Sequence, residues 1–274
     1  MPRSGDRRQR RDGDISCMRR LALAATVAAL ALPAGTSAAV PGWWQPPLDS
    51  TLQVQFGGLP VDQTVDASIY DLDAFDTDAS TVAALQAAGK HVLCYVDAGT
   101  WEHWRPDATQ YPKSVRGRKN GWPGEKWLDI RQFDVIAPII DARLDLCAAK
   151  GFDGVEFDNV DGYANRTGFK LTPADQLLFD SWLATAAHAR GLAAGLKNDL
   201  DQVPDLVDRF DFAIDEQCAQ YSECDLLSPF ISAGKPVFEI EYELPSSEFC
   251  PQAAALGFAA MRKHLSLDAW RQAC

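Results

Sequence analysis

Short apolar runs recur along the chain, and many of them end in an acidic residue. Most of these runs are nearly continuous in apolar residues, which is typical of strands that are buried on both faces of a sheet. The pattern predicts eight strands, at 52–56, 67–72, 91–97, 153–158, 192–197, 210–215, 236–241 and 257–261.

Helical patterns separate several of these strands. Three long helices, each followed directly by a glycine, are predicted at 77–88, 133–150 and 172–190. Glycine is favoured just after a helix because it adopts the left-handed backbone conformation without a steric penalty. Two shorter helices are predicted at 200–209 and 222–233, the second of which contains Pro229.

A unit made of a helix, a glycine, a polar link and a strand repeats in the segments AAGKHVLCYV, AAKGFDGVEF, ARGLAAGLK and SAGKPVFEIE. Strands that alternate with helices form parallel sheets. Eight such strands predict an α/β fold with one domain, a (β/α)8 or TIM barrel, whose usual size is about 250 residues. A doubly wound open sheet is the alternative, but no G-x-G-x-x-G follows the first strand. The Trp-rich segment 99–131 predicts a long loop over the C-terminal mouth of the barrel.

The first 39 residues have the pattern of an export signal. Arg19 and Arg20 precede a 12-residue apolar run, which is too short to span a bilayer, and small residues follow it. We expect cleavage near Ala38 or Ala39, which leaves residues 40–274 as a secreted barrel domain. Met18 is an alternative start of translation, because residues 1–17 would form an unusually long leading segment.

The cysteines agree with export. Six of the seven lie in the predicted barrel domain, and an even number in an exported chain predicts disulfides. Cys218 and Cys224 are close enough for a small loop, and Cys250 with Cys274 would tie the C-terminal tail. Cys94 and Cys147 remain, as a bridge or as two buried thiols. We expect no metal and no cofactor, because the chain has no histidine and cysteine cluster with zinc spacing.

The charge balance excludes two classes of partner. The chain has a net charge of −12, and residues 1–39 contain seven arginines and three acids, so the barrel domain carries −16. Nucleic acids and anionic membranes are bound mainly by clustered lysine and arginine. We therefore expect a mature protein, in monomeric form, that binds neither nucleic acid nor membrane, and an acidic surface suited to a cationic partner.

Acidic residues stand at the end of almost every predicted strand, where TIM-barrel enzymes place their chemistry. They are Asp71, Asp97, Asp158, Asp199, Asp215, Glu216, Glu239 and Glu241. Trp101, Trp104, Trp122 and Trp127 lie in the long loop beside this rim. Glycoside hydrolysis uses a pair of carboxylates, and tryptophan faces stack on sugars and attract ammonium groups. The combination predicts a carbohydrate site.

Each of these residues also has a plainer interpretation. A single strand-end aspartate is often the cap of the next helix, and the four loop tryptophans could pack under a lid. Lys197 fits a substrate-binding or ion-paired role better than a Schiff base. We interpret Glu125 and Lys126 as a solvent-exposed loop pair. The four histidines lie in different predicted elements, and we expect them to be non-catalytic.

An ordered set of motifs resembles glycoside hydrolase family 114, the endo-α-1,4-polygalactosaminidase type of (β/α)8 enzyme. The resemblance runs from about Trp43 to the C-terminus. The motifs are WWQPP, YDLD, CYVDAGTWEHWRPD, GWPGEKWLDIR, GFDGVEFDNVDGY, GLKND, DFAIDEQC and FEIEYE.

The resemblance implies hydrolysis of α-1,4-linked galactosamine polymers, a cationic amino-sugar polysaccharide, without a cofactor. Carried over by motif, the catalytic pair is Asp158, as nucleophile in a retaining mechanism, and Glu216, as general acid and base. The position of Asp215 departs from the family, in which asparagine is commoner. Residues implied to line the cleft are Asp71, Asp97, Glu102, Arg105, Trp127, Asp129, Asn159, Tyr163, Lys197, Asn198, Gln217, Glu241 and Tyr242.

Two other functions remain open at the level of sequence. One is a barrel that binds amino-sugar polymer without cutting it, and the presence of both candidate acids argues against it. The other is a different barrel hydrolase, such as a metal-dependent phosphodiesterase, and the shortage of histidine at the strand ends argues against it.

Overall fold

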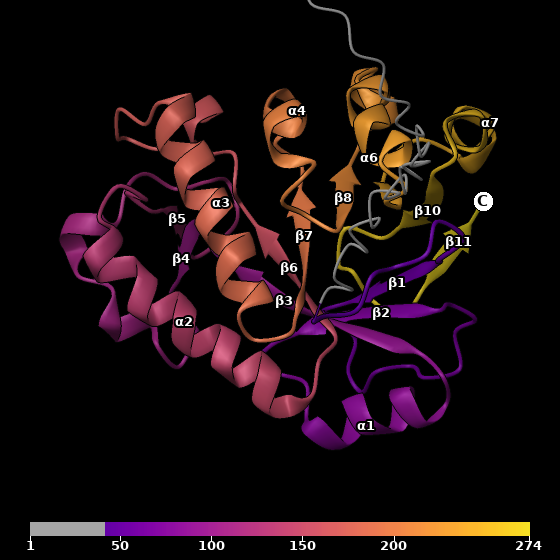
Figure 1. The fold of residues 1–274 in the computed structure, drawn as a ribbon, viewed down its shortest axis with the longest axis horizontal. Coiled ribbons are helices and arrows are strands. Elements are labelled where there is room, and N and C mark those ends of the chain that lie inside the picture. Colours follow the sequence, from indigo (N-terminus) through magenta and orange to yellow (C-terminus); the bar gives the residue numbers. More distant parts are fainter. Residues whose placement is uncertain (1–41) are drawn as a thin grey trace, which may run out of the picture. The chain divides into compact units, whose positions relative to one another are not determined.

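The computed structural model describes residues 42–274, so the predicted export signal lies outside the described residues. Eight parallel strands follow one another in chain order around the sheet (Figure 1). A short ninth strand pairs antiparallel with the last of them. The strands are β1 Leu52–Gln55, β2 Ile69–Asp73, β3 His91–Asp97, β6 Gly154–Asp158, β7 Ala193–Lys197, β8 Phe212–Glu216, β9 Val237–Glu241, β10 Ala259–Lys263 and β11 Arg271–Ala273.

The link between β10 and β11 closes the barrel against β1. The backbone N–H groups of Phe56 and Gly57 donate to the carbonyl oxygen of Leu267 at 2.9 and 3.1 Å. The sheet is therefore nearly closed, and the predicted TIM-barrel fold is confirmed. All eight predicted strands are present, with bounds that differ by up to two residues.

Helices cover the outside of the sheet, and the three long predicted helices are present. They are α1 Ala79–Ala87, α2 Phe133–Lys150 and α3 Pro173–His188. The first predicted short helix divides into η4 Leu200–Gln202 and α4 Val203–Leu206, and the second into η5 Cys224–Leu227 and α6 Ser228–Ser232. Helices α5 Cys218–Tyr221 and α7 Ser246–Leu256 were not predicted, and Pro251 inside α7 obscures its pattern. Single 3-10 turns lie at η1 Ala108–Gln110, η2 Lys113–Val115 and η3 Gly162–Ala164.

The predicted long loop 99–131 contains a hairpin. Strand β4 Thr100–Glu102 pairs antiparallel with β5 Glu125–Trp127. This hairpin follows β3 directly, so it lies at the carboxyl end of the barrel, where it adds residues to the wall of the mouth.

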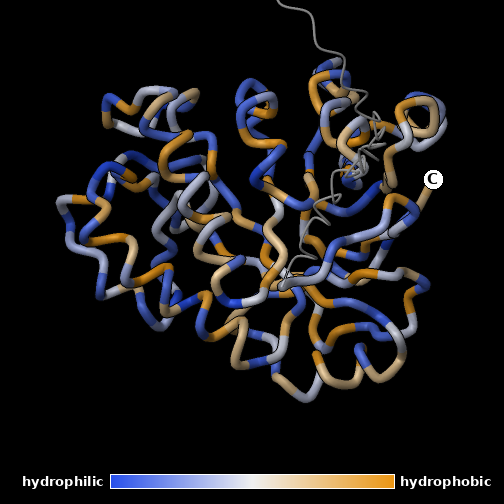
Figure 2. The backbone as a smooth tube through the Cα atoms, viewed as in Figure 1, coloured by the Kyte–Doolittle hydropathy of each residue, from blue (hydrophilic) through white to orange (hydrophobic). Residues whose placement is uncertain are grey.

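The barrel interior changes from apolar to polar along the strands. One apolar cluster fills it near the amino ends and includes Ile69, Leu93 and Phe212. Because side chains alternate between the two faces of a strand, the next inward positions are Asp71 and Tyr95. A larger cluster packs the outer sheet face against the helices. Hydrophobic residues accordingly recur along both strands and helices (Figure 2).

Three disulfides join the six cysteines of the described chain. The pairs are Cys94–Cys147, Cys218–Cys224 and Cys250–Cys274. The predicted small loop and C-terminal tie are confirmed, and Cys94 with Cys147 forms a bridge rather than two thiols. Disulfides persist in oxidising compartments. Within residues 42–274, no helix has the length and apolar character needed to cross a membrane.

Candidate active site

Lys197 lies at the centre of the polar layer and contacts three carboxylates. Its ammonium nitrogen is 3.2 Å from Glu156 Oε1, 3.3 Å from Asp158 Oδ1 and 3.3 Å from Glu216 Oε2. Burial alone would lower the pKa of Lys197, but the charges of the three acids outweigh it and raise that pKa well above its usual value. A permanently charged lysine therefore holds the two predicted catalytic acids beside each other.

A tyrosine contacts the other oxygen of each acid. The Tyr95 hydroxyl donates to Asp158 Oδ2 at 2.8 Å, and the Tyr242 hydroxyl donates to Glu216 Oε1. Asp158 Oδ1 also accepts from the backbone N–H of Asn159 at 2.9 Å. Burial, with the nearby Asp158 and Glu216 charges, raises the pKa of Tyr95 and Tyr242, respectively, so both stay protonated donors.

Three strands are each followed by a residue with left-handed backbone conformation. These residues are Asn159 after Asp158, Asn198 after Lys197 and Gln217 after Glu216, with φ values of 59°, 52° and 69°. Asparagine tolerates this conformation better than most residues. The side chain of Asn198 accepts from the backbone N–H of Glu216 at 3.0 Å, so one turn supports the next strand end.

Gly99 makes room for the turn after β6. A Cβ atom at Gly99 would lie 1.7 Å from the carbonyl oxygen of Asn159. We expect Gly99→Ala to lower the free energy of unfolding by about 1–3 kcal/mol, as overpacking does, and to reduce kcat because the turn that carries Asp158 must shift. Chemical denaturation and steady-state kinetics measure both effects. Gly42→Ala is the control, since no atom lies within 4 Å there, and equal behaviour of the two variants would contradict the expectation.

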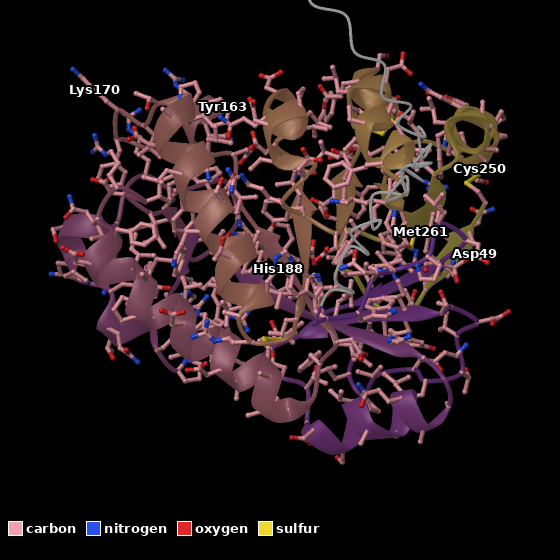
Figure 3. The ribbon with its side chains drawn as sticks, in the orientation of Figure 1. Asp49, Tyr163, Lys170, His188, Cys250 and Met261 are labelled. Atoms are coloured by element: carbon pink, nitrogen blue, oxygen red, sulfur yellow. A yellow bond between two sulfur atoms is a disulfide. The ribbon has the colours of Figure 1, made fainter. Side chains whose placement is uncertain are left out.

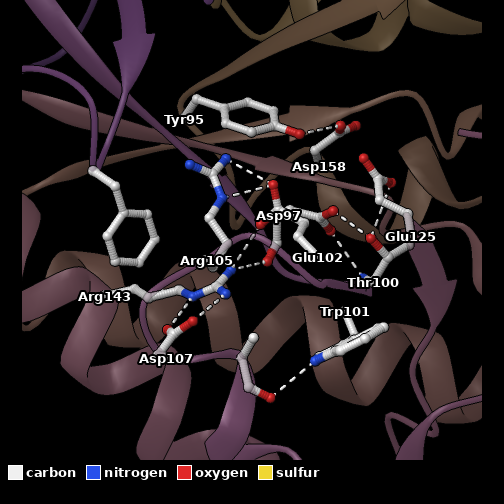
Figure 4. A network of polar contacts seen from close by, with 12 residues as sticks. Tyr95, Asp97, Thr100, Trp101, Glu102, Arg105, Asp107, Glu125, Arg143 and Asp158 are labelled. Atoms are coloured by element: carbon white, nitrogen blue, oxygen red, sulfur yellow. Dashed lines mark hydrogen bonds and ion pairs between the residues drawn. The ribbon is translucent and has the colours of Figure 1, made fainter. Parts of the chain in front are cut away.

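A second polar network lies behind the acids, under the β4–β5 hairpin (Figure 4). Arg105 contacts Glu102 at 2.7 Å and Asp73 at 2.6 Å. Arg143 pairs with Asp107 at 2.8 Å and reaches Glu102 at 3.5 Å. These two buried cations compensate the charges of Glu102, on the hairpin, and of Asp73 and Asp107.

Glu125 corrects one sequence interpretation. It is buried rather than solvent-exposed, and its Oε2 accepts from Thr100 at 3.2 Å and from Asn120 at 2.5 Å. Burial raises the pKa of Glu125 to about 7. Its pairing partner across the hairpin is Glu102, which is also buried.

Two cavities meet at the predicted acid Glu216. The larger, which we call the central cavity, has a volume of about 540 Å³ and is lined by both Asp158 and Glu216. The smaller, which we call the side cavity, has a volume of about 320 Å³ and is lined by Glu216 but not by Asp158. Asn198 and Gln217 also line both. Binding space is therefore present beside Glu216 in both cavities.

Most of the predicted cleft residues line these cavities. Those on the central cavity are Glu102, Arg105, Asp158, Asn159, Lys197, Asn198, Glu216, Gln217 and Tyr242. Tyr163 lines the side cavity. His188 lies far from Tyr163 (Figure 3), where it contacts Asp211 at 2.8 Å and stacks on Trp43. None of the four histidines lines either cavity.

Five predicted cleft residues lie behind the cavity walls. Asp71 is fully buried beneath Glu156, and Asp97 accepts from Thr100. Glu241 accepts from the backbone N–H groups of Ala219 and Gln220 and so supports the loop after β8. The last two, in or just after the hairpin, are the buried Trp127 and Asp129, which pairs with Arg131.

The sequence did not single out several residues that line the central cavity. Tyr95 shares the inward face of β3 with Asp97, and its spacing could have indicated it. Phe56, at the end of β1, carries no such signal. Trp104 and Trp122, which the sequence did place beside the rim, line the cavity with 45% and 48% of their surface exposed. Trp101 instead packs under the guanidinium of Arg116 at 4.2 Å.

One group of acids has the spacing of metal ligands. Asp97, Glu102 and Glu125 offer oxygens within 4.8 Å of one another. However, Glu102 is paired with Arg105 and Arg143, which compensate its charge. Among the described residues, two arginines thus balance the negative charge of this cluster.

Two solved structures are similar to this chain over most of its length. Aspergillus fumigatus Ega3, solved in complex with galactosamine, is 42% identical with a TM-score of 0.81, over 84% of this chain and 97% of that one. The glycoside hydrolase domain of Pseudomonas aeruginosa PelA has a TM-score of 0.65 over 81% of this chain and 98% of that one, and at 14% identity it supports the fold alone. No curated protein sequence matches the chain.

The comparison with protein families covers the whole described barrel. The model of glycoside-hydrolase family GH114 matches residues 33–274. The match includes every residue of the two cavities and of the Lys197 cluster. The chain therefore belongs to glycoside hydrolase family GH114.

Proposed function

We propose that this protein is a secreted endo-α-1,4-polygalactosaminidase. The observation that carries the proposal is the pair of carboxylates, Asp158 and Glu216, held on one buried lysine at the wall of a shared cavity. Family membership makes the reaction a glycosidic hydrolysis. The 42% identical relative bound to galactosamine supports the choice of sugar.

The contacts of the two acids support different roles. Asp158 accepts hydrogen bonds from Tyr95, Lys197 and the Asn159 backbone, and three donors stabilise a carboxylate. Glu216 has two such donors, Lys197 and Tyr242, and it lines the side cavity together with two further acids, Asp215 and Glu223. We assign Asp158 as the nucleophile and Glu216 as the acid that protonates the leaving oxygen.

The distance between the acids supports a retaining mechanism. The two oxygens that contact Lys197 lie at most twice 3.3 Å apart, and retaining enzymes hold their carboxyl groups about 5–5.5 Å apart. Asp158 would attack the anomeric carbon as Glu216 gives its proton to the glycosidic oxygen, which leaves with the bond electrons. Glu216 then takes a proton from water, whose oxygen replaces Asp158 on the sugar.

The two cavities support cleavage within a chain rather than at its end. They share Glu216, Asn198 and Gln217 and otherwise have different linings, so sugar units fit on both sides of the bond that is cut. Trp104 and Trp122 offer exposed rings for stacking on the central side. The −16 charge of residues 40–274 suits a polymer of ammonium sugars.

We propose export after cleavage near Ala38 or Ala39, a monomeric mature protein, and activity without a cofactor. The three disulfides support an oxidising compartment.

The purified protein should release reducing ends from deacetylated α-1,4-galactosamine polymer, with an early fall in polymer length. We expect kcat/KM to fall about tenfold as salt rises, because screening weakens the attraction between acidic cleft and cationic chain. The fully acetylated polymer is the matched control and should show weak salt dependence. Tight binding without any product at any pH would instead support a non-catalytic binding barrel.

A further inference from the structure

The side cavity is lined by acids from the ends of three strands and from the loops that follow them. These acids are Asp161, Asp199, Asp201, Asp215, Glu216 and Glu223, and no lysine or arginine lines the cavity. Tyr221, on α5, exposes 61% of its surface at the same cavity. The combination of acids and an exposed aromatic ring suits a sugar that carries a positive charge.

Asp215 is an unpartnered acid in the wall of this cavity. It is 1% exposed, and its Oδ1 has no hydrogen-bond partner among residues 42–274. A buried polar atom without a partner costs free energy and calls for an explanation. Its position on β8 explains the burial, because alternation directs Asp215 away from the barrel interior that Glu216 faces.

The charges around Asp215 in the free protein are poorly balanced. Burial, together with the charges of Glu223 and Glu216, raises the pKa of Asp215 well above its usual range. Burial and the charge of Asp161 raise the pKa of Asp199 to about 8. A cation in the side cavity would remove this repulsion and give Asp215 Oδ1 a donor.

The position of the side cavity relative to the two catalytic acids tells which sugar it holds. The unit that is attacked must touch both the nucleophile and the acid, and only the central cavity has both in its wall. Of the two catalytic acids, only Glu216 lines the side cavity, so this cavity lies on the side of the leaving oxygen. This step rests on the proposed function, because it uses the roles of Asp158 and Glu216.

We propose that the side cavity is the leaving-group subsite and selects a sugar unit with a free ammonium group, for which Asp215 is a counter-ion. Cleavage then occurs just before a deacetylated unit. Every cut exposes that unit as the new non-reducing end of one product. The attacked unit, in the central cavity, is under no such selection by Asp215.

The test is the composition of the new chain ends. Partially acetylated α-1,4-galactosamine polymer is digested, the new reducing ends are labelled with borodeuteride, and the products are sequenced by mass spectrometry. We expect free amines to be enriched about tenfold or more at new non-reducing ends, the ratio that one charge-assisted hydrogen bond provides. In Asp215→Asn the enrichment should fall toward the average of the polymer.

Asp225→Asn is the matched control, because Asp225 is an exposed acid of η5 that lines neither cavity. It should keep the enrichment. Thermal unfolding should show Asp215→Asn to be at least as stable as the wild type, since it removes an unpartnered buried charge. Wild-type products whose non-reducing ends match the average composition of the polymer would overturn the proposal while leaving the proposed function intact.

Binding of galactosamine, measured by calorimetry, keeps the two proposals separate. If no polymer is cleaved, the proposed function is wrong. Galactosamine binding then tests by itself whether the side cavity is an ammonium site. Galactosamine binding that is about tenfold weaker in Asp215→Asn than in Asp225→Asn would then support an ammonium site. Equal binding by the two variants would overturn it.

Discussion

Asp158→Asn should reduce kcat/KM on deacetylated galactosaminan by about 10³-fold or more, the scale on which loss of a catalytic nucleophile acts. The amide matches the carboxylate in size. Its oxygen can still accept from Lys197 and the Asn159 backbone, and its NH2 group can donate to the Tyr95 hydroxyl oxygen, so the fold should remain intact. What is lost is the negative charge that attacks the anomeric carbon. Release of reducing ends, with thermal unfolding as a check of folding, measures the effect.

Glu216→Gln should behave differently from Asp158→Asn on a substrate with a good leaving group. An aryl galactosaminide leaves without protonation, so the first step should survive in Glu216→Gln and fail in Asp158→Asn. On the polymer both variants should be impaired. Glu248→Gln, an exposed surface change, is the control for loss of a glutamate charge. Full activity on the polymer in either active-site variant, with the fold intact, would refute the assignment.

Lys197→Met should damage both stability and catalysis. The ammonium group contacts Asp158, Glu156 and Glu216, and its removal leaves three neighbouring acids without their cation. Breaking a buried ion pair from one side costs about 3–5 kcal/mol. We expect a loss of that size in the free energy of unfolding and a fall in kcat of about 10²-fold, as for a misplaced catalytic group.

The pH dependence of Lys197→Met distinguishes positioning from simple structural support. Burial raises the pKa of Glu156, and the Lys197 charge opposes this rise. Without the cation this acid holds its proton to higher pH, so the acid limb of the pH–rate profile should move upward. The 4% exposure of Lys197 leaves little surface for direct contact with substrate, so KM should change less than kcat. A variant that unfolds more easily but keeps the wild-type kcat and pH profile would contradict this role.

The fold was predictable from sequence because its signals are local. A glycine at the end of a helix followed by an apolar strand recurs along the chain, as expected of a (β/α)8 barrel. All eight predicted parallel strands are present. Helix α7 was not predicted because Pro251 interrupts its pattern. The β4–β5 hairpin was missed because each strand has only three residues.

The candidate site was predictable only as a set of strand ends. Asp158, Lys197 and Glu216 each lie at the end of a predicted strand. Because these strands are parallel, their ends lie at the same rim of the barrel. Burial depends on packing between distant segments, so sequence alone did not separate Asp71, beneath Glu156, from the acids that line a cavity. For the same reason the burial of Glu125, which accepts from Thr100 on the partner strand, was not predicted.

The anomeric form of the first product tests the central claim most directly, namely that Asp158 attacks the sugar while Glu216 protonates the leaving oxygen. Proton NMR of a digest of α-1,4-galactosamine polymer records the newly formed reducing ends before they equilibrate. Two displacements, through Asp158 and then water, predict α ends first. Initial formation of β ends would mean direct attack by water and would contradict Asp158 as the nucleophile.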